Sequence, residues 1–297
     1  MRFIVRLGAV IIAMAALGAC GRMEQSPRAR PGDGAVIYQS TILTMDPERP
    51  TAEAVIIKDG LVLDIGAIDD LVQAYPGASF DERFLRRTLL PAFVDARLPP
   101  NALNVTEIAC QGAILPEEIA ALASGDAPAR IVVRGPAALA AAVGAVRRLR
   151  AEGSTAAIAI EAGEGVDGAT AGALTAAGVA LVLSDPPAES RCGPEDGFSA
   201  LGAMDSISGL IAIAPSDEDA SLLAAASRYL HDDGPVRLSP QDALEAITRD
   251  AAYALGEDST RGVIKIGRLA AFAALDRNPL ASPAEAWGAI AVEIVEL

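Results

Sequence analysis

The residues best suited to chemistry in this sequence are a few carboxylates and arginines at the ends of predicted strands. Asp95 and Arg97 follow a buried apolar segment, and Arg134, Glu161 and Asp185 each end or follow another apolar run. Carboxylates can transfer protons and arginines bind anions, so such a cluster could bind a small polar ligand or perform acid–base chemistry. The alternative is a network of ion pairs without a catalytic role.

The chain contains a single histidine, His231. A catalytic zinc ion usually takes several His, Asp, Glu or Cys ligands, so the composition argues against a hydrolytic zinc site. His231 lies at the end of a predicted helix, where a cation interacts favourably with the helix dipole, and we interpret it as a cap or surface residue. Without a second histidine, no serine has a convincing base for nucleophilic catalysis.

The composition indicates a soluble body with an aliphatic core. The 297 residues are 52% hydrophobic but only 4% aromatic, enough for one large domain or two small ones. The net charge of −15 argues against nucleic acid as a partner, because the phosphate backbone attracts basic surfaces.

The N-terminus has the pattern of an export signal. Arg2 and Arg6 precede an apolar run that is too short to span a bilayer, and small residues follow it. The sequence LGAC, ending at Cys20, resembles a bacterial lipobox, which implies a signal peptide over 1–19 and a lipid on Cys20. Residues 20–34 are rich in Arg, Pro, Ser and Gly and are predicted to form a flexible tether. The alternative is an ordinary secretory signal cut nearby.

Export would place the two remaining cysteines, Cys110 and Cys192, in an oxidising compartment. They could form a disulfide or remain buried free thiols. Their spacing does not decide between the two.

The body alternates predicted strands with predicted helices, which favours an α/β fold with parallel strands. The candidate strands are Leu89–Val94, Val105–Cys110, Arg130–Arg134, Ala156–Glu161, Ala180–Leu183 and Leu210–Ala214. The candidate helices are 116–123, 136–152, 169–177, 219–230 and 240–255. The stretch from Phe93 to Arg261 is shorter than the about 200 residues or more of a full eight-stranded barrel, so we expect roughly six strands.

Several stretches, in the same order as in the family, resemble the metal-dependent amidohydrolase superfamily. Residues 44–47 read TMDP and residues 54–66 read AVIIKDGLVLDIG, with a hairpin signal at Asp59-Gly60. Residues 89–100 read LLPAFVDARLPP, similar to the end of the family's first barrel strand. Residues 238–256 and 262–276 resemble the family's closing helix and the strands that return to its small β-domain.

The resemblance implies a trimmed or incomplete TIM-like (β/α) barrel with a small β-sandwich domain formed by both chain ends. Its expected parts are 35–88 and 262–297 for the small domain and 89–261 for the barrel. An open barrel exposes the edges of its outer strands. A second copy of the chain could cover these edges, so a homodimer is plausible.

The resemblance also implies zinc, but the positions of its ligands are occupied by other residues. Arg97 and Pro99 stand where the family has its first histidine pair, Ala162 replaces a mid-barrel histidine, and Ile213 replaces the last-strand aspartate. Asp185 offers a second local match for that aspartate. Arginine is always protonated and proline has no side-chain donor, so we expect no metal and no other cofactor.

We therefore expect a degenerate amidohydrolase-like lipoprotein at the bacterial cell envelope, anchored by lipid and facing the periplasm. It would act as a binding or scaffold module for a small polar ligand or a protein. The alternative is an active amidohydrolase for non-peptide carbon–nitrogen bonds, working through an unrecognised site that includes Glu161 and Asp185.

Overall fold

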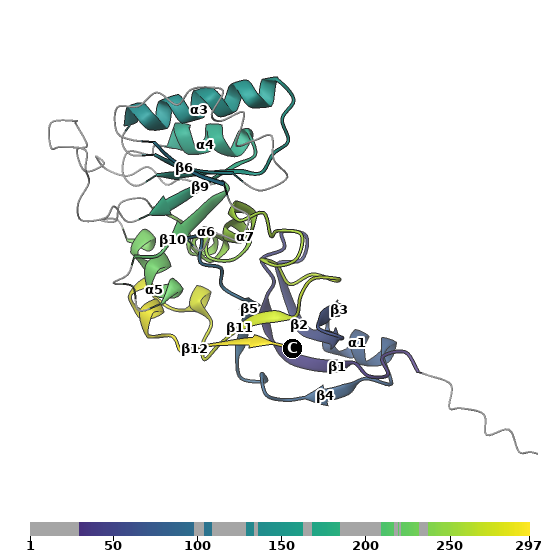
Figure 1. Cartoon of the computed structure of the whole chain (residues 1–297). Coiled ribbons are helices and arrows are strands. Elements are labelled where there is room, and N and C mark those ends of the chain that lie inside the picture. Colours follow the sequence, from purple (N-terminus) through teal and green to yellow (C-terminus); the bar gives the residue numbers. More distant parts are fainter. Residues whose placement is uncertain are drawn as a thin grey trace, which may run out of the picture.

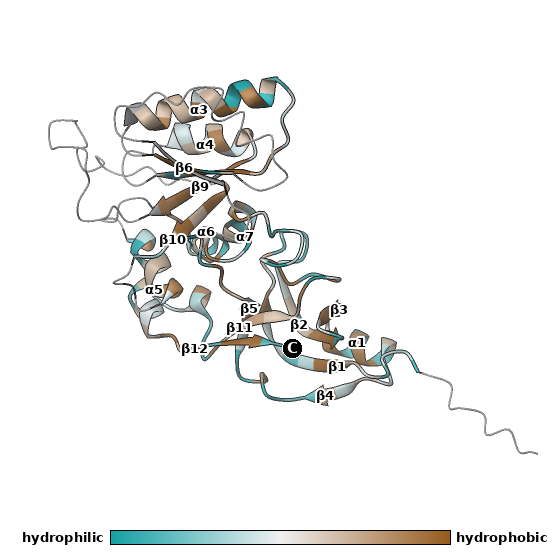
Figure 2. Cartoon of the chain, viewed as in Figure 1, coloured by the Kyte–Doolittle hydropathy of each residue, from teal (hydrophilic) through white to brown (hydrophobic). Residues whose placement is uncertain are grey.

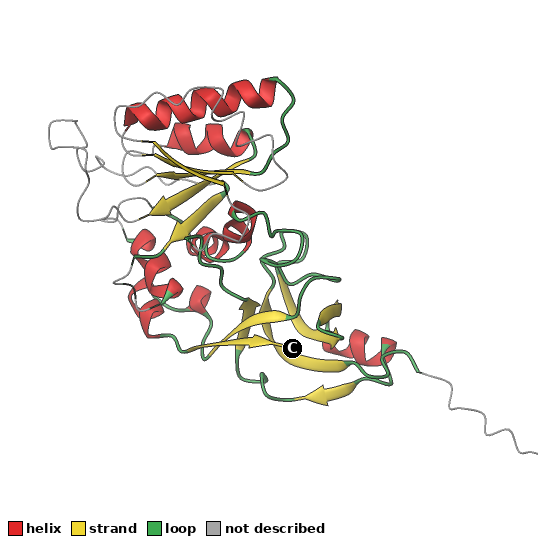
Figure 3. Ribbon diagram, in the orientation of Figure 1, coloured by secondary structure: helices red, strands yellow, loops and turns green. Residues whose placement is uncertain are grey.

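The structure is a computed structural model that describes residues 30–97, 104–108, 129–133, 136–162, 168–184, 209–216, 219, 221–231 and 237–297. The residues outside these ranges include Cys20, Pro99, Cys110, Arg134, Asp185 and Cys192. The signal and most of the tether lie outside them as well. Two sheets organise the described chain, and most helices lie beside the parallel one (Figure 3).

Both ends of the chain build one seven-stranded sheet (Figure 1). Its strands are β1 (Val36–Leu43), β2 (Thr51–Lys58), β3 (Leu61–Gly66), β4 (Ser79–Asp81), β5 (Thr88–Pro91), β11 (Ala271–Leu275) and β12 (Val292–Glu296). The strand order is β12-β11-β5-β1-β2-β3, and β4 also pairs with β1. The prediction of a small β-domain formed by both ends is confirmed; its strands make a single hydrogen-bonded sheet.

The β2–β3 hairpin turns at the predicted Asp59-Gly60 pair. Both residues have positive φ angles, +52° and +77°, the conformation that matches the twist of a two-residue hairpin. Helix α1 (Ile68–Ala74) follows and buries Leu71 against Ile37 and Ile56 of the sheet.

The second sheet is parallel and has the order β10-β9-β8-β7-β6. Its strands are β6 (Asn104–Ile108), β7 (Ala129–Val133), β8 (Ile158–Ala162), β9 (Val179–Ser184) and β10 (Ile211–Ala214). Helices α3 (Pro136–Ala151) and α4 (Gly168–Ala176) connect successive strands and cover one face of the sheet. Figure 2 shows that β9 and β10 are strongly apolar, as expected for parallel strands buried on both faces.

The predicted strand Leu89–Val94 is shorter and belongs to the other sheet. Strand β5 ends at Pro91 and pairs with β1 and β11, so the described part of the barrel has five strands. Both faces of β5 are apolar, because Leu89 packs into the small sheet's core and Leu90 packs toward the parallel sheet. Beyond it, the amide of Val94 donates to the carbonyl of Ile247 instead of to a strand.

The C-terminal helical region is more broken than predicted. Helix α5 (Leu222–Ser227) continues as the 3-10 turn η1 (Arg228–Leu230), and the predicted helix 240–255 divides into α6 (Pro240–Ala246) and α7 (Arg249–Ala254). The break lies at Thr248, which leaves the helical backbone (φ −132°, ψ −92°) while its hydroxyl donates to the carbonyl of Leu244. The 3-10 turns η2 (Pro279–Ala281) and η3 (Ala284–Ala289) precede β12.

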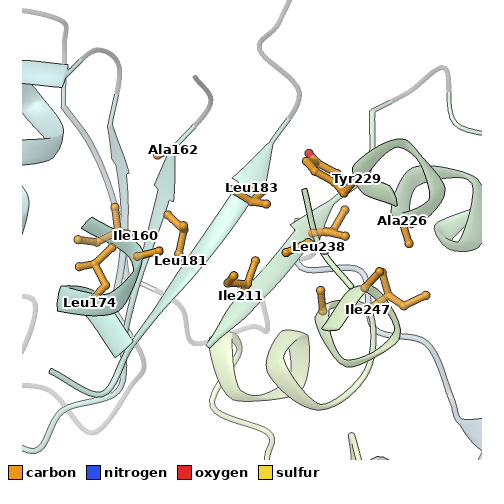
Figure 4. Close-up of a cluster of buried hydrophobic side chains, with 14 of the residues drawn as sticks. Ile160, Ala162, Leu174, Leu181, Leu183, Ile211, Ala226, Tyr229, Leu238 and Ile247 are labelled. Carbon is orange, nitrogen blue, oxygen red and sulfur yellow. The ribbon is translucent and has the colours of Figure 1, made fainter. Parts of the chain in front are cut away.

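One core joins the two sheets. Figure 4 shows the part of it that lies between the parallel sheet and the helices. Ile160, Leu181 and Ile211 share this cluster with Leu174 of helix α4 and with Leu90 of the small sheet. None of the described helices is long and apolar enough to cross a membrane.

Candidate active site

The two faces of the parallel sheet have different roles. One face packs against the helices through large aliphatic side chains. On the other, Val132, Glu161, Val182 and Ala212 lie level on four neighbouring strands. Small residues dominate this second face, and helix α7 covers its amino end. In TIM-like folds the carboxyl ends of the strands carry the chemistry, so Glu161, near the end of β8, is the described residue best placed for it.

Arg130 of β7 is bound to Glu161. Arg130 is level with Ala159, so its side chain runs along the sheet toward the carboxyl end. Its Nε donates to Oε2 of Glu161 at 2.9 Å, and its Nη2 lies 2.7 Å from the same oxygen. At 2.7 Å, Nη2 forms an ion pair with the carboxylate, although it does not meet the geometry of a hydrogen bond.

The same guanidinium also holds the segment that follows β5. Nη1 of Arg130 donates to the backbone carbonyl of Ala96. Ala96 is fully buried, and Val94 packs beside it on the small residues of the second face. Arg130 is only 3% exposed, so its charge depends on these two acceptors for the stabilisation that water would otherwise give.

Asp95 and Arg97 form a separate, local pair. The amide of Arg97 donates to Oδ1 of Asp95 at 2.8 Å, and Nη2 of Arg97 lies 3.2 Å from Oδ2. The Arg97 side chain is 40% exposed and that of Asp95 is 19% exposed, so solvent screens this pair more than the Arg130–Glu161 pair. Arg130 therefore unites Glu161 and Ala96, while Asp95 pairs with its sequence neighbour Arg97.

Ala162 and Ile213 lie on the helix-covered face. Both are buried in the core beneath the helices, at the level of Leu183 on β9. Because successive side chains of a strand point to opposite faces, Ala162 faces away from its neighbour Glu161. The apolar side chains at these two positions fit the packing of the helices.

Asp219 is a buried acid that the sequence interpretation did not single out. It follows β10, is 8% exposed at its side chain, and lies 3.0 Å from Nη2 of Arg228. Its Oδ2 also accepts from the amide and the hydroxyl of Ser216, at 2.7 and 3.0 Å. The sequence does contain a signal for this acid: Ser216 ends an apolar strand and stands three residues before Asp219. His231, by contrast, lies half-buried directly after η1, as the pattern predicts for a helix end.

Another ion pair lies at the opposite, amino end of the sheet. Oδ1 of Asp250 lies 2.8 Å from Nε of Arg249, and Oδ2 accepts from the amide of Ile211, the first residue of β10. Burial raises the pKa of Asp250 to about 6, although Arg249 and the Ile211 amide oppose that rise. This end of such a fold is associated with stability, not with chemistry.

The described residues do not fit a hydrolytic zinc centre. In this part of the chain, no three His, Cys, Asp or Glu residues are grouped so that they could hold a metal ion. The carboxylate of Glu161 is bound by Arg130, and the side chains of Ala162 and Ile213 carry no donor atoms. The described groups can hold an anion or a backbone segment in place, and no step through a metal is derived from them.

Comparisons with known proteins show which family the chain belongs to. A sequence model described as "Amidohydrolase family" matches residues 64–295. Among solved structures, an amidohydrolase from Thermotoga maritima MSB8 is 12% identical with a TM-score of 0.56, covering 88% of this chain and 98% of that one. A prolidase in complex with N-methylphosphonate-L-proline is 14% identical with a TM-score of 0.55, covering 88% and 99% of the two chains. No curated protein matches.

At these identities the structural likeness shows the fold alone, and it confirms the predicted α/β class with an incomplete TIM-like barrel. The sequence model covers most of the chain and carries the family assignment. The chain belongs to the amidohydrolase family.

Proposed function

We propose that this protein is an amidohydrolase-fold binding or scaffold module without metal-dependent hydrolysis. In this proposal a lipid on Cys20 holds it at the bacterial cell envelope, facing the periplasm, and residues 20–34 tether the body. Its partner is a small polar ligand or a protein, and exposed barrel edges favour a second copy of the chain as a further partner.

The observation that carries the proposal is the contact between Arg130 and Glu161. Glu161 lies on the second face, one residue before the end of β8, and a permanently charged guanidinium lies 2.7 Å from it. A metal ion bound by this carboxylate would have to displace or closely approach that guanidinium, and like charges repel strongly where water is excluded. The contact instead joins β7, β8 and the segment after β5 into one rigid unit.

Metal content is the decisive measurement. Protein beginning at Gly21, expressed without its lipid, is purified, passed through gel filtration and analysed for zinc, manganese, iron and nickel. We expect no stoichiometric metal and a cooperative melt that added zinc does not shift, since a ligand that binds the folded state raises its stability. About one metal ion per chain, together with hydrolysis that a chelator abolishes, would overturn the proposal.

The second candidate is an active amidohydrolase for non-peptide carbon–nitrogen bonds. Family membership and the position of Glu161 near the end of β8 favour it. Asp185 follows the next strand in the sequence and would supply a second carboxylate. A substrate panel is tested with the Glu161→Ala/Asp185→Ala double variant as the control. Turnover that the double variant loses would support this candidate, and equal turnover in both proteins would exclude these residues.

A further inference from the structure

Strand β12 is one edge of the small sheet, at the end of the strand order β12-β11-β5-β1-β2-β3 (Figure 1). It pairs with β11 on its inner side, and none of the described strands pairs with its outer side. Its outer side, over Val292–Glu296, is the β12 edge. An unpaired edge strand presents a row of backbone N–H and C=O groups that another strand can bind.

Two backbone hydrogen bonds fix which residues of β12 face β11. The amide of Leu297 donates to the carbonyl of Ala270 at 3.0 Å, and the amide of Asp276 donates to the carbonyl of Ala291 at 3.2 Å. These bonds lie just beyond the two ends of the β11–β12 ladder and follow its register. Hydrogen-bonded and non-hydrogen-bonded pairs alternate along an antiparallel ladder, so every second residue counted from Leu297 or Ala291 faces β11.

The residues between them point their backbone groups outward, and these are Val292, Ile294 and Glu296. Among the described residues, no group donates to or accepts from these outward N–H and C=O groups. The side chain of Ile294 is 54% exposed. A large apolar side chain therefore stands in the middle of an unpaired row of hydrogen-bonding groups.

The opposite edge of the same sheet is covered by the chain itself. The amide of Val62 in β3 donates to the carbonyl of Arg268, and its carbonyl accepts from the amide of Gly267. Farther along β3, Nη1 of Arg49 donates to the carbonyl of Ile65 at 2.7 Å. The two edges of the sheet thus differ, because described groups occupy the β3 side and leave the β12 edge open.

The sequence of β12 suits a second, antiparallel copy of the same strand. The register with the most backbone bonds sets Ile294 opposite its own counterpart, because all three outward residues are then paired. Each Glu296 then stands opposite a Val292 and each Glu293 opposite a Val295, so no two carboxylates oppose each other. A shift by two residues pairs only two outward residues. In one direction it opposes Glu293 to its own counterpart, and in the other it sets Ile294 against Glu296.

We propose that this protein forms a homodimer through its β12 edges, with a two-fold axis at Ile294 that joins the two small sheets into one. The two Ile294 side chains pack against each other, and the outward backbone groups bond across the axis. This rests on the proposed function only in taking a second copy of the chain as a partner. The β12 edge lies on the small sheet and is separate from the barrel edges and from Glu161.

Sedimentation velocity on protein beginning at Gly21, without its lipid, measures the association. An interface centred on a five-residue strand is small, so we expect a weak dimer with a dissociation constant of about 10–100 μM. Ile294→Lys should weaken the dimer at least about tenfold, because two ammonium groups meet and an apolar contact is lost.

Ile266→Lys is the matched control. Ile266 is 58% exposed, close to the 54% of Ile294, but its neighbour Gly267 bonds to β3 at the opposite edge of the sheet. This variant gains the same charge on the same small domain, so it should dimerise like the wild type. Both side chains are exposed, and both variants should keep the wild-type melt.

A charge swap tests the two-fold register itself. Ile294→Glu alone should dimerise as poorly as Ile294→Lys, because two carboxylates then meet at the axis. An equimolar mixture of the two variants should restore a dimer to within about tenfold of the wild-type dissociation constant, because each ammonium then faces a carboxylate.

The inference is overturned if the wild type remains monomeric up to about 500 μM, or if Ile294→Lys dimerises as well as Ile266→Lys. It is also overturned if the mixture of Ile294→Lys and Ile294→Glu stays monomeric, since residue 294 then does not meet its own counterpart. None of these results alters the metal measurement, so failure here is distinguishable from failure of the proposed function.

Discussion

The guanidinium of Arg130 lies against the carboxylate of Glu161, with Nε 2.9 Å and Nη2 2.7 Å from the same oxygen. The arginine side chain is 4% exposed and the glutamate side chain 20% exposed, so this is the most buried ion pair on the second face of the parallel sheet among the described residues. A third acceptor, the carbonyl of Ala96, ties the segment after β5 to the pair.

Removing one member of this pair should destabilise the protein strongly. Arg130→Met keeps a long apolar side chain but leaves the Glu161 carboxylate and the Ala96 carbonyl without their donor. We expect a loss of about 3 kcal/mol in the free energy of unfolding, measured with denaturant. The Arg130→Met/Glu161→Met double variant should recover most of it. As a control, Arg83→Met breaks an exposed pair with Asp81 and should change little; an equally small effect for Arg130→Met would contradict the prediction.

Asp250 should make stability fall as pH rises through the weakly acidic range. Burial raises its folded-state pKa to about 6, above the about 3.9 of an unfolded chain. The folded protein therefore keeps a proton that the unfolded chain releases between pH 4 and 6. The stabilisation of the folded state by this retained proton is fully present below pH 4 and is lost above pH 6. It is on the order of 3 kcal/mol in the free energy of unfolding.

Asp250→Asn tests this directly, because the amide oxygen can still accept from Ile211 but does not titrate. The free energy of unfolding is measured from pH 4 to 7.5 for both proteins. Contributions from groups that are the same in both proteins largely cancel in the difference. The wild type should lose stability relative to the variant across this window, and two parallel pH profiles would show that Asp250 is ionised throughout.

A comparison of Gly262 with Gly153 can measure how much a close steric contact costs in stability. Both have a φ angle of +91°, which costs any other residue about 1–2 kcal/mol. A Cβ atom at Gly262 would lie 2.7 Å from Cβ of Ala252 and 3.0 Å from Cα of Arg249, whereas one at Gly153 would meet nothing within 4 Å. Gly262→Ala should therefore destabilise the protein clearly more than Gly153→Ala, and equal effects would mean that α7 moves aside.

Cys20 should carry the lipid that holds the protein at the membrane. In a bacterial host, the full chain should incorporate labelled palmitate and fractionate with membranes, because acyl chains on the mature N-terminus bury many methylene groups. Cys20→Ser should abolish both. Cys110→Ser is the control and should leave both unchanged. Membrane association that persists in Cys20→Ser would point to a different anchor.

The sequence predicted the hairpin turn, the joining of the two chain ends in one small domain, and the parallel sheet. Asp59-Gly60 predicted the β2–β3 hairpin, because few residues other than Gly, Asn and Asp tolerate positive φ angles. The order of the motifs at the two chain ends predicted that both contribute to one small β-domain, as β5 and β11 show by pairing. The alternation of strands and helices predicted the parallel sheet.

What the sequence alone could not decide is which sheet and which face a residue joins. Leu89 and Leu90 are apolar in either sheet, and only their pairing with β1 and β11 placed them in the small one. The face of Ala162 depended on the register of β8, since a shift of one residue turns every side chain to the other side. Arg130 and Glu161 are 31 residues apart, and their contact exists only because two parallel strands bring them together, where burial makes a charged arginine depend on a nearby carboxylate.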